Sequence, residues 1–182
     1  MQDRRKKILE TGLAILREHG LAGLTQPRVA SQCGLRQSHL TYYYPTRADL
    51  LTAVARAAIE GQLAAAASLP RNIKSKREAA TRIAAVVTRH ENTRVLAALN
   101  QAADQEPAVR TLFNELLRGF TAELGRLLEQ LEIAPSEANI DLLHAVFVGL
   151  SIIDLATDRK NGRARANAAV QLVLNLMSGE AR

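Results

Sequence analysis

The stretch of residues 25–51, TQPRVASQCGLRQSHLTYYYPTRADLL, decides how this chain begins to fold. Thr25 or Gln26 can cap a helix, and Pro27 is tolerated in a first turn, where backbone N–H groups have no helical partner. Gly34 is placed to end this short helix, and a second short helix fits directly after it. Two short helices joined by a glycine-containing turn are the plan of a helix-turn-helix motif.

Helical spacing of apolar residues continues on both sides of this motif. Between Asp3 and His19 the apolar residues Ile8, Leu9, Ile15 and Leu16 recur at helical spacing, and Gly20 suits the end of that helix. Gly12 inside it costs about 1 kcal/mol relative to alanine and is tolerated if another helix packs close to it. Further helices are predicted over 47–67, 74–90, 93–104 and 109–131, from Pro135 onward, and over 163–178. The chain is therefore predicted to be all-α.

Positive charge is concentrated at the N-terminal end of the 182-residue chain. The formal net charge is +6, and residues 1–62 carry nine Lys or Arg against five Asp or Glu. Residues 63–182 carry fifteen against thirteen. The excess charge lies mainly on the first third of the chain, which permits a polyanionic partner but does not by itself require one.

Residues that form catalytic or metal sites are scarce or scattered. The single cysteine, Cys33, rules out an internal disulfide, and the four histidines lack zinc-site spacing. Asp141 and His144 form half of a carboxylate di-iron motif that has no second copy. We therefore expect no enzyme, no metal and no cofactor. The chain shows no signal peptide, and its longest strongly apolar stretch, AVFVGLSII, is too short to span a bilayer, so we expect a cytoplasmic protein without a membrane partner.

All tyrosines of this chain, which is only 3% aromatic, stand together as Tyr42, Tyr43 and Tyr44. Apolar spacing in the two short helices predicts a small core that leaves one side of the second helix exposed. The side chains predicted to face outward there are Arg36, Gln37, Ser38, His39, Thr41 and Tyr43. Such side chains suit base edges and phosphates, with arginine binding guanine and glutamine binding adenine.

The run from Ile8 to Leu51 resembles the DNA-binding domain of the TetR (tetracycline-repressor) family of transcriptional regulators. The resemblance rests on Ile8-Leu9, Ile15-Leu16, Glu18-His19-Gly20, Leu24-Thr25, Val29-Ala30, Gly34-Leu35, Leu40, Tyr42-Tyr43-Tyr44-Pro45 and Asp49-Leu50-Leu51. It implies a three-helix DNA-binding domain, residues 1–50. A shared helix would join this domain to a helical effector-binding and dimerisation domain, residues 51–182.

The resemblance also implies roles for individual residues. Tyr44 takes the place of a phenylalanine that packs into the small core, Tyr42 lies next to the DNA backbone, and Tyr43 contacts phosphate. The residues expected to contact DNA are Thr25, Gln26, Arg28, Arg36, Gln37, Ser38, His39, Thr41, Tyr42, Tyr43 and Arg47. Arg36, His39 and Thr41 depart from the residues usual in the family, which leaves the operator sequence open.

The C-terminal part is expected to hold a dimer interface. Apolar side chains occur all around residues 140–155, and a helix that is apolar all round must be buried all round. In so small a domain, a second subunit most readily supplies the cover. The last helix has a matching stripe, which predicts a four-helix interface in a homodimer. The predicted interface residues are Val146, Gly149, Ile153, Val170, Val173, Leu174 and Met177.

A pocket for a small-molecule effector is expected among the remaining helices. Its candidate residues are His90, Asn100, Phe113, Phe120, His144 and Phe147, with Asp154 as a further candidate. Two interpretations stay open. One is a repressor that an effector releases from a palindromic operator in double-stranded DNA, by acting through the helix from Arg47 to Ala67. The other is a DNA-binding regulator without a small-molecule ligand.

Overall fold

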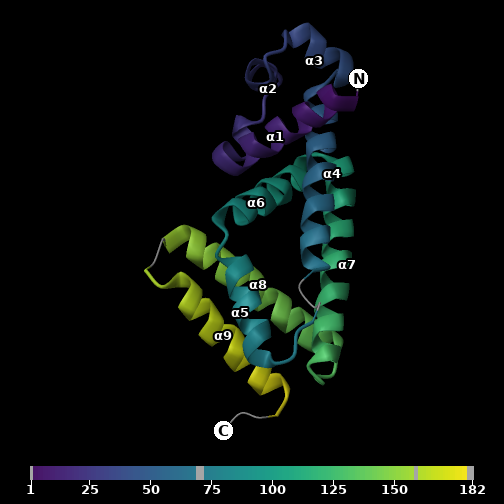
Figure 1. Cartoon of the computed structure of the whole chain (residues 1–182). Helices are drawn as coiled ribbons and strands as arrows, with labels where there is room; N and C mark the ends of the chain where they lie inside the picture. The colour runs from purple at the N-terminus through teal and green to yellow at the C-terminus, as the bar shows by residue number, and fades with distance from the viewer. Residues whose placement is uncertain (1, 69–71, 158–159, 180–182) are drawn as a thin grey trace. The chain divides into compact units, whose positions relative to one another are not determined.

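The computed structural model describes residues 2–68, 72–157 and 160–179, which form helices joined by turns, without a strand. The helices are α1 (Gln2–Gly23), α2 (Gln26–Cys33), α3 (Gln37–Tyr43), α4 (Arg47–Ala66), α5 (Lys76–Val87), α6 (His90–Gln105), α7 (Pro107–Gln130), α8 (Glu137–Thr157) and α9 (Gly162–Met177) (Figure 1). The predicted all-α fold is confirmed, and the predicted helices differ from these only by a few residues at their ends.

The chain packs into two compact units. The first consists of Met1–Gln62 and Arg94–Leu116, and the second of Leu63–Thr93 and Leu117–Arg182. Helices α4, α6 and α7 each begin in one unit and end in the other. Each compact unit is therefore built from two separate segments of the chain. The expected functional boundary after residue 50 stays a prediction.

Within the first unit we call residues 2–54 the head. Its first helix, α1, is interrupted at Gly20, whose φ of 63° and ψ of −165° are not helical. The sequence predicts the helix end at this glycine, and the interruption lies there. One further turn extends to Gly23 and carries the chain on to Leu24, which joins Leu21 in the core.

Gly12 lies where α1 and α4 come closest. A Cβ atom at this position would lie 2.5 Å from Cγ2 of Val54, whereas non-bonded carbons are in contact at about 3.5–4.0 Å. Only glycine lets the two helices pack at this separation. The condition under which the sequence tolerates Gly12, a second helix packed close to it, is therefore met.

Capping side chains set where the next helices begin. The Oγ1 atom of Thr25 accepts a hydrogen bond from a first-turn N–H at 3.4 Å, so Thr25 and not Gln26 is the N-cap of α2. Gly34 ends α2 with a φ of 69°, which glycine adopts without steric cost. Thr46 and Asp49 form a capping box at α4. The carboxylate of Asp49 accepts from the backbone N–H of Thr46 at 2.9 Å, and Oγ1 of Thr46 accepts from the backbone N–H of Asp49 at 3.0 Å.

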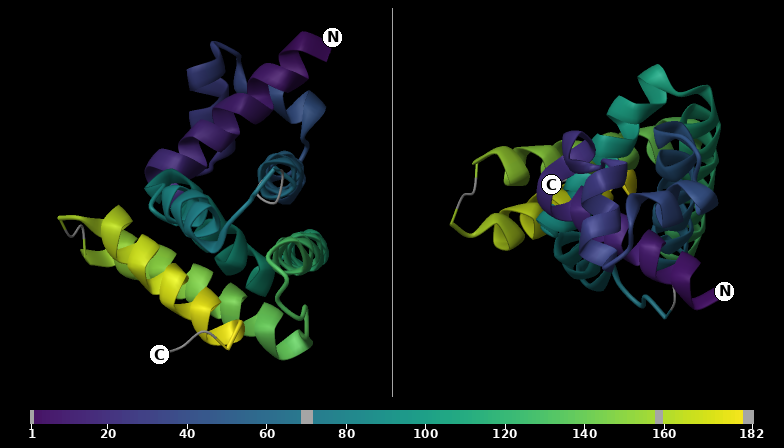
Figure 2. Two further views of the ribbon diagram at one scale, coloured as in Figure 1. Left: turned by 60° about the horizontal axis from the view of Figure 1, so that its bottom comes forward. Right: turned by 90° about the horizontal axis from the view of Figure 1, so that it is seen from above.

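The second unit is built around an apolar core. Helix α5 lies along α9, and α8 contacts both of them (Figures 1 and 2). This core includes Ile83, Val87, Leu124, Leu127, Leu128, Ile133, Leu143, Phe147, Val170 and Leu174. Helix α7 contributes Leu124, Leu127 and Leu128 to this core from its C-terminal part.

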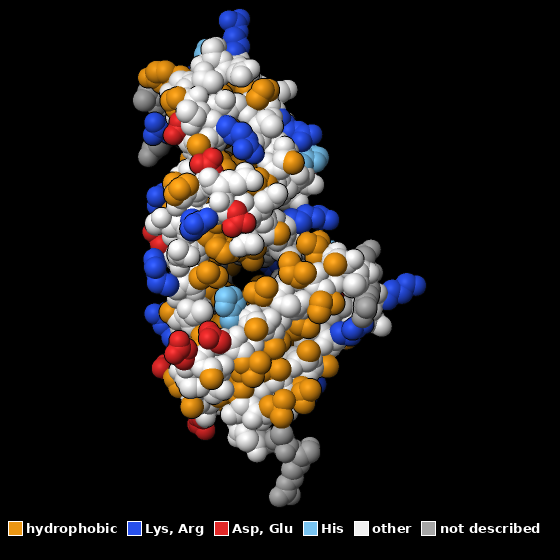
Figure 3. Space-filling model, turned by 180° about the vertical axis from the view of Figure 1, so that it is seen from behind, with side chains coloured by type: hydrophobic (Ala, Val, Ile, Leu, Met, Phe, Trp, Pro, Cys, Tyr) orange, Lys and Arg blue, Asp and Glu red, His pale blue; other side chains and the backbone are white. Residues whose placement is uncertain are grey.

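One face of the second unit leaves large apolar side chains exposed to solvent. Hydrophobic side chains gather in the lower half of the view in Figure 3. We call this surface the exposed apolar face. It consists of Leu142, Val148, Ile152 and Ile153 of α8 together with Leu172 and Leu176 of α9, each 47–59% exposed. The sequence predicts that α8 is buried all round, but within one chain only Leu143 and Phe147 of this helix are buried.

Helix α8 is also long and apolar enough, by length and composition alone, to cross a membrane, the one such helix in the described part of the chain. Its most apolar window has a mean hydropathy of 1.7. The apolar stretch AVFVGLSII, too short on its own, forms only part of this window. The same helix contributes Leu143 and Phe147 to the core of the second unit.

Candidate nucleic-acid interface

Helix α3 depends on the rest of the head for its stability, because isolated helices shorter than about 12–15 residues are marginal in water. Leu40 is its one buried residue among Gln37–Tyr43. The turn before it is fixed by the backbone N–H of Leu35, which donates to the carbonyl of Ala30 at 2.9 Å. Arg36 occupies the N-cap position without a side-chain hydrogen bond to the helix. Its guanidinium group is therefore not used to start α3.

The residues expected to contact DNA all reach the surface of the head. Those that are exposed are Arg28, Arg36, Gln37, Ser38, His39, Tyr42 and Arg47. Those that are half-buried are Thr25, Gln26, Thr41 and Tyr43. They come from α2 and α3, from the N-cap residues Thr25 and Arg36 before these helices, and from the first residue of α4. None of them is lost to the core.

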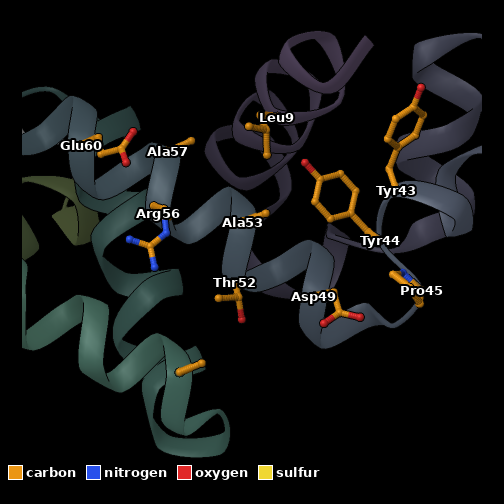
Figure 4. A pocket seen from close by; sticks show the side chains of 11 residues that line it. Leu9, Tyr43, Tyr44, Pro45, Asp49, Thr52, Ala53, Arg56, Ala57 and Glu60 are labelled. Atoms are coloured by element: carbon orange, nitrogen blue, oxygen red, sulfur yellow. The ribbon is translucent and has the colours of Figure 1, made fainter. Parts of the chain in front are cut away.

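The three tyrosines have three different surroundings. Tyr42 is 78% exposed, and its ring meets that of Tyr43 edge to face, with centroids 5.4 Å apart. The guanidinium of Arg5 lies over the Tyr43 ring, 5.8 Å from its centroid, within cation–π range. Partial burial raises the pKa of Tyr44, and the charge of Arg5 opposes this only in part. Figure 4 shows the Tyr44 ring pointing toward Leu9, whereas the Tyr43 ring points elsewhere. The structure thus packs Tyr44 and leaves Tyr42 in solvent.

Positive charge lies beside these rings. Arg4, Arg5, Lys6 and Lys7 occupy the first turns of α1, and all four are exposed. Through Arg5 and Tyr43 the start of α1 contacts α3. Sequence patterns show a basic run at 4–7 but not this contact, because residues so far apart in the chain leave no local signal of their proximity.

Gln26 has a partner that the sequence does not predict. Its side-chain Nε2 donates to the carbonyl oxygen of Tyr44 at 2.8 Å and to that of Pro45 at 3.4 Å. A DNA phosphate only accepts hydrogen bonds, and the donor group of this amide is directed at the protein backbone instead. The expectation that Gln26 contacts DNA is therefore not supported by its geometry, and Gln26 joins the start of α2 to the turn after α3.

A hollow of about 670 Å³ opens beside Tyr44, between α1, the turn after α3 and α4 (Figure 4). Its lining includes Leu9 and Tyr44 and the charged side chains of Asp49, Arg56 and Glu60. No sequence pattern indicates this hollow, because its lining residues come from separate helices and share no motif.

Residues 8–54 match the model of a family described as bacterial regulatory proteins, tetR family. The head belongs to the tetR family. The match begins at Ile8 and ends at Val54, the residue that packs on Gly12, so it covers the helix-turn-helix motif and its α1–α4 support.

Solved structures share the fold of the whole chain beyond this tetR-type head. A transcriptional regulator from Rhodococcus sp. Rha1 is 16% identical over 98% of both chains, with a TM-score of 0.83. A TetR transcription regulator from Haloarcula marismortui ATCC 43049 is 17% identical over 97% of this chain and 99% of that chain, with a TM-score of 0.75. The multidrug binding protein EbrR, complexed with proflavin, is 24% identical over 93% and 99%, with a TM-score of 0.65. A comparison with curated proteins finds no match.

Three residues expected to line an effector pocket come together in the second unit. The ring centroid of Phe120 lies 5.2 Å from that of His144 and 5.2 Å from that of Phe147, which it meets edge to face. Partial burial lowers the pKa of His144, and the nearby charge of Asp141 offsets this only in part. The site therefore favours a neutral imidazole beside two phenyl rings.

The other effector candidates have different surroundings. The Nε2 atom of His90 lies 2.9 Å from Oδ2 of Asp154, whose side chain is 15% exposed. Gly162 leaves no room for a Cβ atom against the same carboxylate. Asn100 is exposed, so its interpretation as a polar residue on a buried face is wrong, and it belongs with Phe113 to the first unit. Helical periodicity alone does not say which side of α6 is covered.

The predicted dimer residues fall into two groups. Val170 and Leu174 are fully buried in the core of their own chain, so their assignment to a subunit interface is wrong. Those that pack partly against the same core are Val146, Val173 and Met177. Ile153 is 51% exposed, and Gly149 has open space around its Cα atom. Since α9 is apolar on two sides, its periodicity did not reveal that Leu172 and Leu176 face outward.

Proposed function

We propose that this protein is a transcriptional regulator that binds double-stranded DNA through its tetR-type head. The main support is the exposed side of α3, where Gln37, Ser38, His39 and Tyr42 stand clear of the core, close to the basic start of α1. A polar helix of this kind in a helix-turn-helix motif suits the major groove. Gln37 and His39 are assigned to base edges, because their side chains donate and accept hydrogen bonds.

The remaining basic side chains are assigned to phosphates. They are Arg4, Arg5, Lys6, Lys7, Arg28, Arg36 and Arg47. Each phosphate contact that they make adds about 0.9 to the slope of log affinity against log salt concentration on duplex DNA. Measured binding of wild-type protein to duplex DNA should therefore weaken steeply with salt, and a slope near zero would contradict the proposal.

A substitution in α3 separates base contacts from phosphate contacts. Gln37→Ala should cost about 1–3 kcal/mol on a duplex selected by the wild type from a random library, and little on a scrambled duplex. Gln130→Ala, an exposed glutamine of α7 in the second unit, is the matched control and should leave both affinities unchanged. Equal losses on both duplexes would mean that Gln37 touches only the DNA backbone.

We also propose that the exposed apolar face joins two copies of the chain. Covering one half-exposed leucine, isoleucine or valine contributes about 1 kcal/mol. Six such residues on each of two copies contribute about 12 kcal/mol, of the same order as the cost of association of about 4–15 kcal/mol. The face thus supports a dimer only if most of it is covered. A two-fold axis would then place two copies of α3 on a palindromic operator with half-sites about one helical turn apart.

The dimer is tested by placing a charge within this face. Ile153→Glu should shift the protein from dimer to monomer in sedimentation at micromolar concentration, because a buried unpaired carboxylate is costly. Ala122→Glu adds the same charge at an exposed position of α7 and should leave the dimer intact. A wild type that is monomeric in buffer and binds lipid vesicles would assign the face to a membrane instead.

A small-molecule effector is the second part of the proposal. EbrR, which shares the fold, is a multidrug binding protein solved with proflavin, and the cluster of Phe120, His144 and Phe147 offers aromatic contacts in the second unit. An effector that releases a repressor from DNA would act through α4, which is continuous from the head into the second unit. A coupling of about 1–3 kcal/mol changes DNA affinity by roughly 5–150-fold.

Ligand binding decides between this proposal and a regulator without a small-molecule ligand. A true effector raises the melting temperature by mass action in a screen of small molecules. Linkage also requires that operator DNA weaken effector binding by the same factor by which the effector weakens DNA binding. A compound that binds equally well with and without operator would not be an inducer.

A further inference from the structure

The backbone groups of the turn between α3 and α4 form hydrogen bonds with α3, α4 and one side chain of α2. The backbone N–H of Tyr44 donates to the carbonyl of Leu40 at 2.9 Å. The N–H of Thr46 donates to a carboxylate in α4 at 2.9 Å, and Pro45 between them has no N–H. The carbonyl oxygens of Tyr44 and Pro45 both accept from the side-chain Nε2 of Gln26, at 2.8 and 3.4 Å. One side chain therefore serves both carbonyls of this turn.

Gln26 reaches this turn from the other end of the motif. It is the first residue of α2 and lies 18 positions from Tyr44 in the chain. Carbonyl oxygens only accept hydrogen bonds, so the amide nitrogen of Gln26, and not its oxygen, must face them. The side chain is half-buried, and partial exclusion of water strengthens such a bond.

The last turn of α3 has few other anchors. Leu40 is the one buried residue of the helix and lies in its middle. Beyond it, Tyr42 is 78% exposed, and the hydroxyl of Thr41 donates to a carbonyl of its own helix. The direction of this turn therefore depends on the packed ring of Tyr44, on the contact of Arg5 with the Tyr43 ring and on the hydrogen bonds from Gln26.

We propose that Gln26 is a positioning residue, which fixes the end of α3 relative to α2 and thereby holds the orientation in which Gln37 and His39 of α3 meet base edges. This inference rests on the proposed function. Contacts to base edges need a defined orientation of α3, whereas phosphate attraction to exposed basic side chains tolerates small rotations. Loss of the Gln26 contact therefore weakens specific binding more than non-specific binding.

The first test uses the free protein and needs no DNA. Gln26→Met keeps the length of the side chain but removes the donor, and Gln26→Glu places oxygens against the two carbonyls. Hydrogen exchange of the Tyr44 amide, followed by NMR, should become about 2- to 10-fold faster in Gln26→Met, the range expected for one net hydrogen bond. Exchange should be faster still in Gln26→Glu. Gln32→Met, at an exposed glutamine of the same helix, should leave this rate unchanged.

The second test uses DNA. The probes are a duplex selected by the wild type from a random library and a scrambled duplex of equal length. In Gln26→Met the ratio of specific to non-specific affinity should fall by about 2- to 10-fold for each engaged head. The non-specific affinity and the salt slope should stay at wild-type values, which a general loss of structure would not allow.

The outcomes separate this inference from the proposed function. A wild type that binds no duplex overturns the proposed function, and the exchange rate of the Tyr44 amide then decides the positioning of α3 alone. If Gln26→Met lowers the affinity ratio without changing exchange in the free protein, Gln26 contacts DNA directly and the positioning role is wrong. An unchanged exchange rate together with an unchanged ratio overturns it as well.

Discussion

Replacing Gly12 with alanine tests the packing of α1 on α4 within the head. The new Cβ atom would lie 2.5 Å from Cγ2 of Val54 and 3.6 Å from Cδ1 of Leu24. The first distance is about 1 Å too short for two carbons in contact. Overpacking of this kind destabilises a protein by about 1–3 kcal/mol. The helix propensity of alanine is about 1 kcal/mol more favourable than that of glycine, which offsets part of this loss. We therefore expect Gly12→Ala to lower the free energy of unfolding by up to about 2 kcal/mol.

Gly61 supplies the matched control for this prediction. It is an exposed glycine of α4, and an added Cβ would meet nothing within 4 Å. Gly61→Ala should therefore raise the free energy of unfolding by about 0.5–1 kcal/mol. Urea denaturation at one protein concentration compares the two variants directly, since comparable m-values would show that the same surface unfolds.

A double-mutant cycle identifies the clashing partner. Val54→Ala removes the Cγ2 atom that the new Cβ would meet, so Gly12→Ala should cost less in a Val54→Ala background than in the wild type. A coupling of about 1 kcal/mol or more is expected from contact of this closeness. If Gly12→Ala instead stabilises the protein as much as Gly61→Ala does, α1 and α4 do not approach as the structure shows.

Three further outcomes are expected. Burial holds the pKa of His144 below its ordinary value of 6.5, so the unfolded chain takes up the proton first and the stability contributed by this residue falls as the pH drops below 6.5. In denaturant titrations between about pH 8 and pH 5, the free energy of unfolding of His144→Gln should therefore depend less on pH than that of the wild type. An unchanged pH dependence would mean that His144 does not cause this loss of stability. Because burial raises the pKa of Tyr44, Tyr44→Phe should remove the last phase of an ultraviolet absorbance titration, whereas loss of an earlier phase would contradict its burial. Asp49→Ala should cost about 1 kcal/mol in urea denaturation, and adding Thr46→Ala should cost little more, since both belong to one capping box; additive costs would deny the shared box.

The helix-turn-helix motif can be predicted from the sequence because short-range caps and turns define its helix ends. Thr25 caps α2, and Gly34 ends it in the left-handed region, where other residues meet a steric penalty. Thr46 and Asp49 start α4 by bonds that span only three positions. Each of these features acts over one turn, so residue type and spacing suffice to predict it. The family resemblance over the same residues then gave the DNA-binding expectation, which the match over 8–54 supports.

Long-range contacts in the head could not be predicted in the same way. The bonds from Gln26 to Tyr44 and Pro45, and the position of Arg5 over Tyr43, join residues far apart in the chain. Glutamine beside a helix cap is equally compatible with solvent, DNA or a backbone partner. Only the packing of α2 on α3 selects one of them, and it moves Gln26 from the set of expected DNA contacts to the support of α3.

In the second unit the sequence determined that α8 and α9 are apolar, and the tertiary structure decided which of their sides is covered. Both helices carry more apolar residues than one face needs, so helical periodicity assigns Val170 and Leu174 to an interface as readily as Leu172 and Leu176. Packing against α5 places Val170 and Leu174 in the core and leaves Leu172 and Leu176 more than half exposed. The choice between faces depends on which neighbouring helix is present, and that is a property of the folded chain and not of any short stretch of residues.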